Sequence, residues 1–160
     1  RSGTGRSMSV ADRSVIHIAD GSSVPGWTGG ASIRCLARGE TTGGAFTLLE
    51  LTSPPGTGSP PHVHHHDDEA LFILEGTYTI DEWDTGEVLT ASTGDYVFLP
   101  RGTRHAFRNA GLTTARLLAL TTPAGLDGFF EEVAAAPEHA REIAEKYGLE
   151  FPSQPRNLES

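Results

Sequence analysis

Sulfur-containing residues and basic residues are scarce in this chain. Its 160 residues include one cysteine, Cys35, and one methionine, Met8. A single cysteine cannot form an internal disulfide, so we expect a fold that needs none and, by default, a cytoplasmic location. Lysine and arginine number 12 against 21 aspartates and glutamates, which gives a net charge of −9. A nucleic-acid-binding protein would show a basic surface instead, and an anionic membrane would repel an acidic chain.

Long apolar runs are also missing. No stretch approaches the ~20 residues that a membrane span requires, and the first residues show no signal-peptide pattern. Residues 1–7, which precede Met8, are typical of an expression scar and are left out of the fold prediction. The remaining length suits one domain, which we expect over residues 8–150, with residues 151–160 as a loosely ordered tail.

Glycine, by contrast, is abundant, with 19 residues. Between residues 15 and 121 the chain is a series of short apolar runs separated by turn residues; examples are residues 70–74, 96–99 and 115–120. Short strands with regular turn signals predict an all-β fold, a β-sandwich or barrel. After Pro123 the spacing of Phe129, Phe130 and Val133 becomes helical. One or two C-terminal α-helices are therefore expected over residues 127–147, with Asp127 as a candidate helix cap.

Histidines gather in the middle of the sequence. His62 and His64 alternate along a predicted strand, which places both imidazoles on one face, roughly 6.6 Å apart. Such imidazoles can converge on one divalent ion, with Glu69 and a histidine from a distant strand, His105, as further ligands. The alternative is a solvated surface loop whose affinity for metals is incidental.

A wider pattern surrounds these four residues. It reads G-x5-H-x-H-x4-E-x6-G followed by G-x5-P-x-G-x2-H-x3-N. The other positions in it are Gly56, Gly76, Gly94, Pro100, Gly102 and Asn109. The pattern resembles the two motifs of the cupin superfamily at all ten positions, and the chain is similar to small bacterial monocupins. The resemblance implies a cupin-type β-sandwich or barrel (jelly roll) with C-terminal helices.

The same resemblance implies a metal site. His62, His64, Glu69 and His105 would hold one divalent transition metal in each subunit and leave about two open positions on a six-coordinate ion. Glu69 is also a possible base, the alternative proton acceptor being a water on the metal. Gly76 and Gly94 would permit positive φ at turns, while Pro100 and Gly102 would shape the turn that delivers His105.

Two histidines fall outside the family pattern. His66 has the same strand parity as His62 and His64, so a straight strand would make it an alternative fourth ligand and push Glu69 out of the coordination sphere. Otherwise, His65 and His66 lie at the rim of the barrel.

Strand alternation also suggests what surrounds the metal. If Glu69 points inward, Leu71 and Ile73 do too, and His105 brings Phe107 with it. With Phe46, Leu48 or other residues of the 46–51 stretch, these would line a mainly apolar chamber. Such a lining favours a small, hydrophobic, aromatic substrate.

The same alternation directs Phe72 and Leu74 outward. They would lie against another sheet or a partner subunit. Because cupins commonly pair through such strands, the resemblance implies a homodimer.

Three functions are compatible with this pattern. The first is a metal-dependent polyketide cyclase that closes a ring without net redox change, as in aromatic polyketide (antibiotic) pathways. Zinc is the favoured metal because it has no redox chemistry. The second is a quercetinase-like dioxygenase that uses Fe, Mn, Ni or Cu. The third is a non-catalytic cupin that binds a small molecule.

Overall fold

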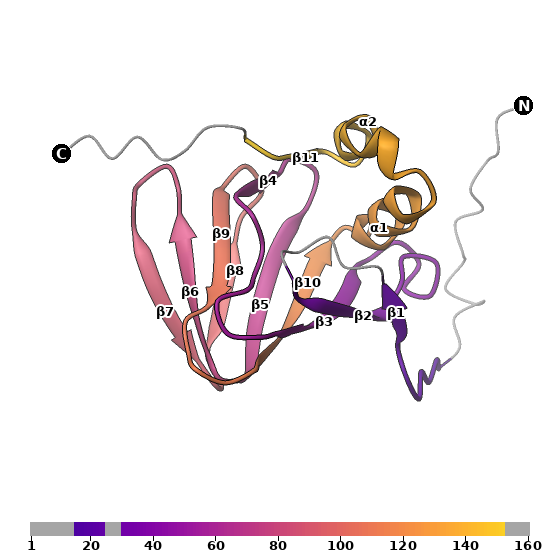
Figure 1. Ribbon diagram of the computed structural model, residues 1–160. Coiled ribbons are helices and arrows are strands. Elements are labelled where there is room, and N and C mark those ends of the chain that lie inside the picture. Colours follow the sequence, from indigo (N-terminus) through magenta and orange to yellow (C-terminus); the bar gives the residue numbers. More distant parts are fainter. Residues whose placement is uncertain (1–14, 25–29, 153–160) are drawn as a thin grey trace, which may run out of the picture.

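The structure of the protein is a computed structural model that describes residues 15–24 and 30–152. The expected expression scar lies outside these ranges, as does most of the expected C-terminal tail. Two antiparallel sheets face each other, with two short helices at one end (Figure 1). The prediction of an all-β fold with C-terminal helices is therefore confirmed.

The larger sheet has six strands. Their order is β1 (Ser22–Val24), β2 (Ser32–Ala37), β3 (Thr47–Ser53), β10 (Ala115–Thr122), β5 (Asp68–Glu75) and β8 (Tyr96–Leu99). The smaller sheet has five. Their order is β11 (Leu149–Glu150), β4 (His62–His64), β9 (Arg104–Asn109), β6 (Thr77–Glu82) and β7 (Val88–Ser92).

The core lies between the inner faces of the two sheets. Along β3, Leu49 and Leu51 are buried while Leu48 and Glu50 are only half-buried, and β10 shows the same alternation. Leu71 and Leu117, on the paired strands β5 and β10, are fully buried. This period of two explains why the chain forms strands, because each strand presents one apolar face to the opposite sheet.

A glycine is required at the turn between β5 and β6. Gly76 has φ 82°, and a Cβ there would come within 2.7 Å of the Ala115 Cβ. Any larger residue would have both an unfavourable backbone and a steric clash. Gly94 also has a positive φ, 91°, as predicted.

The helices follow β10. They are α1 (Leu126–Ala135), a 3-10 turn η2 (Pro137–His139) and α2 (Ala140–Lys146). Phe129 and Phe130 are buried in the main core, so α1 covers one end of the space between the sheets (Figure 1). Asp127 does not cap α1, whose N-cap is Gly125, because its carboxylate is bonded elsewhere: Oδ1 accepts a hydrogen bond of 2.6 Å from the Thr47 hydroxyl. Within the described ranges, no helix is long and apolar enough to cross a membrane.

Candidate metal centre

Residues of three strands meet between the sheets; β4 and β5 are close in sequence, and β9 is distant from both. His62 and His64 come from β4, and His105 comes from the neighbouring strand β9, where it is the register partner of His62. Glu69 comes from β5 in the opposite sheet. All four side chains are buried. The fold thus converts the two sequence motifs into one cluster.

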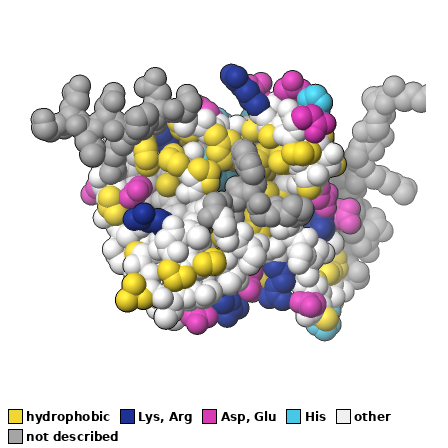
Figure 2. Space-filling view, viewed as in Figure 1, with side chains coloured by type: hydrophobic (Ala, Val, Ile, Leu, Met, Phe, Trp, Pro, Cys, Tyr) yellow, Lys and Arg dark blue, Asp and Glu magenta, His cyan; other side chains and the backbone are white. Residues whose placement is uncertain are grey.

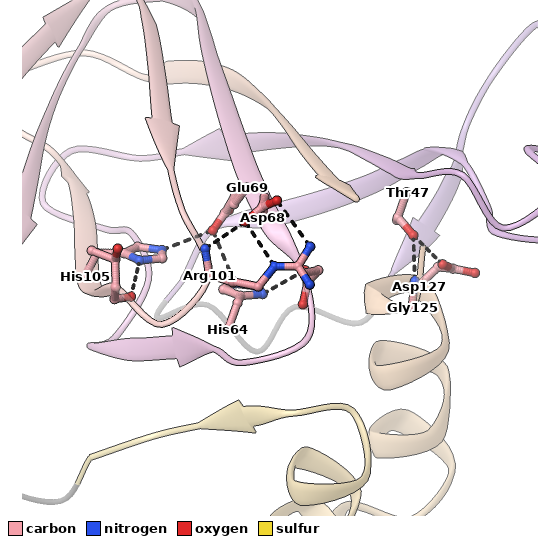
Figure 3. Close-up of polar contacts among 10 residues, drawn as sticks. Thr47, His64, Asp68, Glu69, Arg101, His105, Gly125 and Asp127 are labelled. Carbon is pink, nitrogen blue, oxygen red and sulfur yellow. Dashed lines mark hydrogen bonds and ion pairs between the residues drawn. The ribbon is translucent and has the colours of Figure 1, made fainter. Parts of the chain in front are cut away.

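Glu69 lies at the centre of this cluster (Figure 3). Its Oε2 atom is 3.2 Å from Nε2 of His64 and 3.0 Å from Nε2 of His105. One potential ligand atom from each of the four residues lies within 4.8 Å of the other three. This spacing is compact enough for the four side chains to share one ion.

The outer nitrogen of each imidazole is already bonded. The Nδ1 atom of His62 donates a hydrogen bond of 2.7 Å to the Pro60 carbonyl. Nδ1 of His64 donates to Oδ2 of Asp67 (3.0 Å), and Nδ1 of His105 donates to the Thr103 carbonyl (3.1 Å). Carbonyl and carboxylate oxygens only accept, so each Nδ1 carries the proton. A ring held in this way can direct an Nε2 lone pair toward the cluster once any proton on Nε2 has left. Such partners are typical of metal-binding histidines, and the donor set therefore fits a divalent transition metal.

Burial and neighbouring charges set the protonation of the cluster. Burial, together with the charges of His105 and His64, lowers the pKa of His62 to about 3. Burial also opposes the charge of His64, but Glu69 and Asp67 outweigh it and raise the pKa of His64 to about 10. Burial would raise the pKa of Glu69, yet the charge of His64 and the hydrogen bond from His105 hold that pKa well below its ordinary range. Glu69 is therefore an anion that could ligate a metal.

The structure brings together the four predicted ligands and leaves the two extra histidines outside. β4 ends at His64, and the chain turns before β5 begins at Asp68, so strand parity does not extend to His66. His66 is exposed and faces a separate recess of about 190 Å³ beside Tyr147 and Lys146. His65 is also exposed, and its Nε2 lies 2.8 Å from Oε2 of Glu150. The alternative ligand set with His66 is thus incompatible with this geometry.

A cavity of about 50 Å³ adjoins the cluster, and its walls are mostly apolar. His62, His64 and Glu69 form its polar side. The other lining residues are Ile33, Leu49, Leu51, Ser59, Pro60, Phe107, Ala119, Leu126, Phe129, Phe130, Leu149 and Phe151. Figure 2 shows hydrophobic side chains gathered over the upper part of this face, where α1, β4 and β11 lie in Figure 1.

The predicted lining was only partly correct. Phe107 lines the cavity, whereas Leu71 and Ile73 point inward but are fully buried in the core below it. The prediction that Phe46 and Leu48 line the cavity is wrong. The inward positions of β3 are the odd-numbered residues, so Leu49 and Leu51 line the cavity and Leu48 faces outward.

Sequence reasoning missed the contribution of the C-terminal segment. Phe151, assigned to a loose tail, stacks on His62 with ring centroids 6.0 Å apart and an interplanar angle of 26°. Leu149, in a short strand paired with β4, is also part of the wall. Asp67, next to the histidine run, orients His64. The apolar residues that follow Gly148 could have signalled a strand, but only its pairing partner reveals where they lie.

Comparison with known proteins agrees with this architecture. Residues 49–121 match the family model described as a cupin domain. The quercetin 2,3-dioxygenase of Bacillus subtilis is 30% identical over 107 residues, which are 66% of this chain and 30% of that protein. The tetracenomycin polyketide synthase protein TcmJ of Streptomyces glaucescens is 28% identical over 107 residues, 66% of this chain and 70% of that protein.

A solved structure shows the same fold. The polyketide cyclase RemF from Streptomyces resistomycificus superposes with a TM-score of 0.59 at 24% identity, over 69% of this chain and 79% of that one. The chain spans less than half the length of the quercetin dioxygenase and of the rice germin-like proteins 5-1 and 3-2, which it also matches. The family match and the motif residues identify residues 49–121 as a cupin domain, and the fold shared with RemF agrees with this assignment.

Proposed function

We propose that this protein is a metal-dependent enzyme that acts on an aromatic or polyketide-like small molecule and closes a ring without net redox change. The observation that carries the proposal is the set of three imidazoles whose outer nitrogens are all bonded, converging with Glu69 beside an apolar cavity. The similarity to TcmJ, whose name associates it with a polyketide synthase, supports this substrate class.

His62, His64, Glu69 and His105 would hold the metal. A bound divalent cation supplies a Lewis acid that polarises a substrate carbonyl. Zinc suits a reaction without electron transfer, and imidazole nitrogen and carboxylate oxygen are among its usual ligands.

The residues of the chain orient the site and exclude water. Asp67 fixes the ring of His64 through Nδ1, and the backbone carbonyls of Pro60 and Thr103 do the same for the other two rings. The low pKa of Glu69 makes it a weak proton acceptor near neutral pH, which favours the role of ligand over that of general base. The apolar walls keep bulk water away from a reactive substrate.

A quercetinase-like dioxygenase is the second candidate. The 30% identity to the quercetin dioxygenase of Bacillus subtilis favours it, because the matched 107 residues amount to two thirds of this chain. The same four side chains would then hold Fe, Mn, Ni or Cu, ions that support chemistry with dioxygen.

The metal site is tested by elemental analysis of protein purified without added metal. We expect about one transition metal ion per subunit, and His62→Ala or His105→Ala should lose most of it while the far-UV circular dichroism remains that of a β protein, since three remaining ligands bind more weakly. His65→Ala is the matched control and should keep its metal, because His65 is exposed and contacts Glu150 rather than the cluster. Full metal occupancy in both cluster variants would exclude this site.

Oxygen uptake separates the two activities. With quercetin as the probe, a dioxygenase consumes dioxygen and turns over only aerobically, and its native metal is a redox-active ion. A predominance of zinc, with no oxygen uptake, supports the cyclase. Saturable binding of quercetin without turnover, whichever metal is loaded, would instead indicate a cupin that only binds its ligand.

A further inference from the structure

The C-terminal residues 126–151, here called the strap, run from the end of β10 to the edge of the smaller sheet. β11 closes this course by pairing antiparallel with β4, so Leu149 is the register partner of His64. The amide of His65 also donates a hydrogen bond of 2.8 Å to the carbonyl of Gly148. One end of the strap is therefore attached to the strand that carries two of the proposed metal ligands.

The other end of the strap is attached to the larger sheet. Asp127, in the first turn of α1, accepts the hydrogen bond from the hydroxyl of Thr47 on β3. The strap thus spans the end of the space between the sheets, and its apolar residues face the cluster. Five of the cavity-lining residues belong to it: Leu126, Phe129, Phe130, Leu149 and Phe151.

The cavity beside the cluster is small for the proposed substrate. The cavity measures about 50 Å³, whereas sites for drug-sized ligands usually measure about 300–1,000 Å³. A substrate with one or more aromatic rings therefore needs more room against His62 than the present wall leaves. The side chain that moves should be one whose ring already occupies the space beside the cluster.

Phe151 meets this requirement. Its ring stacks on His62 and, at a centroid distance of 6.4 Å, on Phe129. Phe129 is fully buried in the core and held within the ten-residue helix α1. Phe151 is only half-buried and follows a strand of two residues. Displacing Phe151 therefore disturbs less buried packing than displacing Phe129 does.

We propose that Phe151 is the gate of the site and a determinant of its specificity: its ring covers His62 in the closed state, and the ring of a planar aromatic substrate takes its place. This inference rests on the proposed function for the class of substrate. It adds that the substrate must compete with a side chain of the protein, and that a planar ring is the shape that fits the space.

The test measures binding of N-phenyl-1-naphthylamine, a neutral fluorescent probe with aromatic rings and no oxygen ligands for a metal. When only the open fraction of a protein binds, the apparent Kd exceeds the intrinsic Kd in proportion. Phe151→Ala should therefore lower the Kd of the probe by about five-fold or more, and Phe151→Leu should lower it less. Leu112→Ala, at a loop residue that is 95% exposed, is the control and should match the unmodified protein.

An unchanged or higher Kd in both Phe151 variants would overturn the proposal, because the ring would then be a fixed wall that contributes to binding. Phe151→Leu keeps the test decisive if Phe151→Ala is poorly folded. The titrations are run with chelator-treated and with zinc-loaded protein, and metal content is measured in each sample. Failure of the proposed function appears as absence of bound metal and of turnover, whereas failure of the gate appears as an unchanged Kd in protein that retains its metal.

Discussion

At the scale of the residue, His64 lies between two carboxylates, with Asp67 on its Nδ1 side and Glu69 on its Nε2 side. These charges outweigh the effect of burial and raise the pKa of the imidazole to about 10 in the protein without bound metal. The ring is therefore a doubly protonated, positively charged imidazolium near neutral pH. Because only the neutral ring can donate its lone pair, metal binding must remove that proton.

Zinc binding to the metal-free protein near neutral pH should therefore release about one proton per site. Titration calorimetry in two buffers measures this number as the difference in apparent binding enthalpy divided by the difference in the ionisation enthalpies of the buffers. Asp67→Asn removes one of the two carboxylates that hold the proton, so its zinc binding should release a smaller fraction. An enthalpy that is identical in both buffers would contradict the prediction.

At the scale of the element, β11 depends on a single glycine. Gly148 has φ 71° and joins α2 to this two-residue strand. The imidazole of His66 lies against it so closely that a Cβ at Gly148 would come within 2.4 Å of the His66 Cγ. His66, which parity had suggested as a ligand, therefore packs against Gly148, the residue that directly precedes β11.

Gly148→Ala should destabilise the protein more than Gly94→Ala does. Both glycines have a positive φ, but an added Cβ at Gly94 meets nothing within 4 Å. The difference between the two variants isolates the contact with His66, for which we expect roughly 1–3 kcal/mol. Denaturant unfolding measures the free energies, and hydrogen exchange at the His65 amide should accelerate in Gly148→Ala. Equal losses in both variants would show that His66 moves aside without a penalty.

At the scale of the whole molecule, the outer face of the larger sheet carries an apolar patch on β5 and β8. Phe72 on β5 is the register partner of Tyr96 on β8 and of Leu118 on β10. Phe72, Tyr96 and Phe98 are 42%, 64% and 52% exposed. Leu48, which was expected in the cavity, points to this outer face. Exposed apolar patches of this kind mark interaction surfaces, and β8 lies at the edge of its sheet.

The expected homodimer would bury this face. Light scattering coupled to size exclusion should give twice the mass of the chain, and Phe72→Glu with Phe98→Glu should shift it to the monomer, because buried unpaired charges are unfavourable. Leu112→Glu, at a highly exposed loop residue, is the control and should remain dimeric. A monomeric mass for the unmodified protein at micromolar concentration would refute the homodimer.

Much of the site could be predicted because its residues lie in local patterns. Alternation along residues 62–64 placed two imidazoles on one face, and the turn glycines Gly76 and Gly94 marked where strands end. Errors arose where the outcome depended on long-range contacts. Sequence alternation alone did not show that Leu49 and Leu51 face the cavity instead of Phe46 and Leu48, because the pairing of β3 with β10 and the opposing sheet decides which face is inward.

The amino-acid sequence by itself determined the β architecture, the motif glycines and the four residues suited to a metal, since these follow from strand alternation, turn conformation and ligand chemistry over short distances. Only the tertiary structure decided what encloses the site. The pairing of β11 with β4 brings Phe151 onto His62, although about 90 residues separate the two in sequence. The contact between Gly148 and His66 lies directly before β11. Contacts over such separations depend on the packing of the complete fold, which no local pattern encodes.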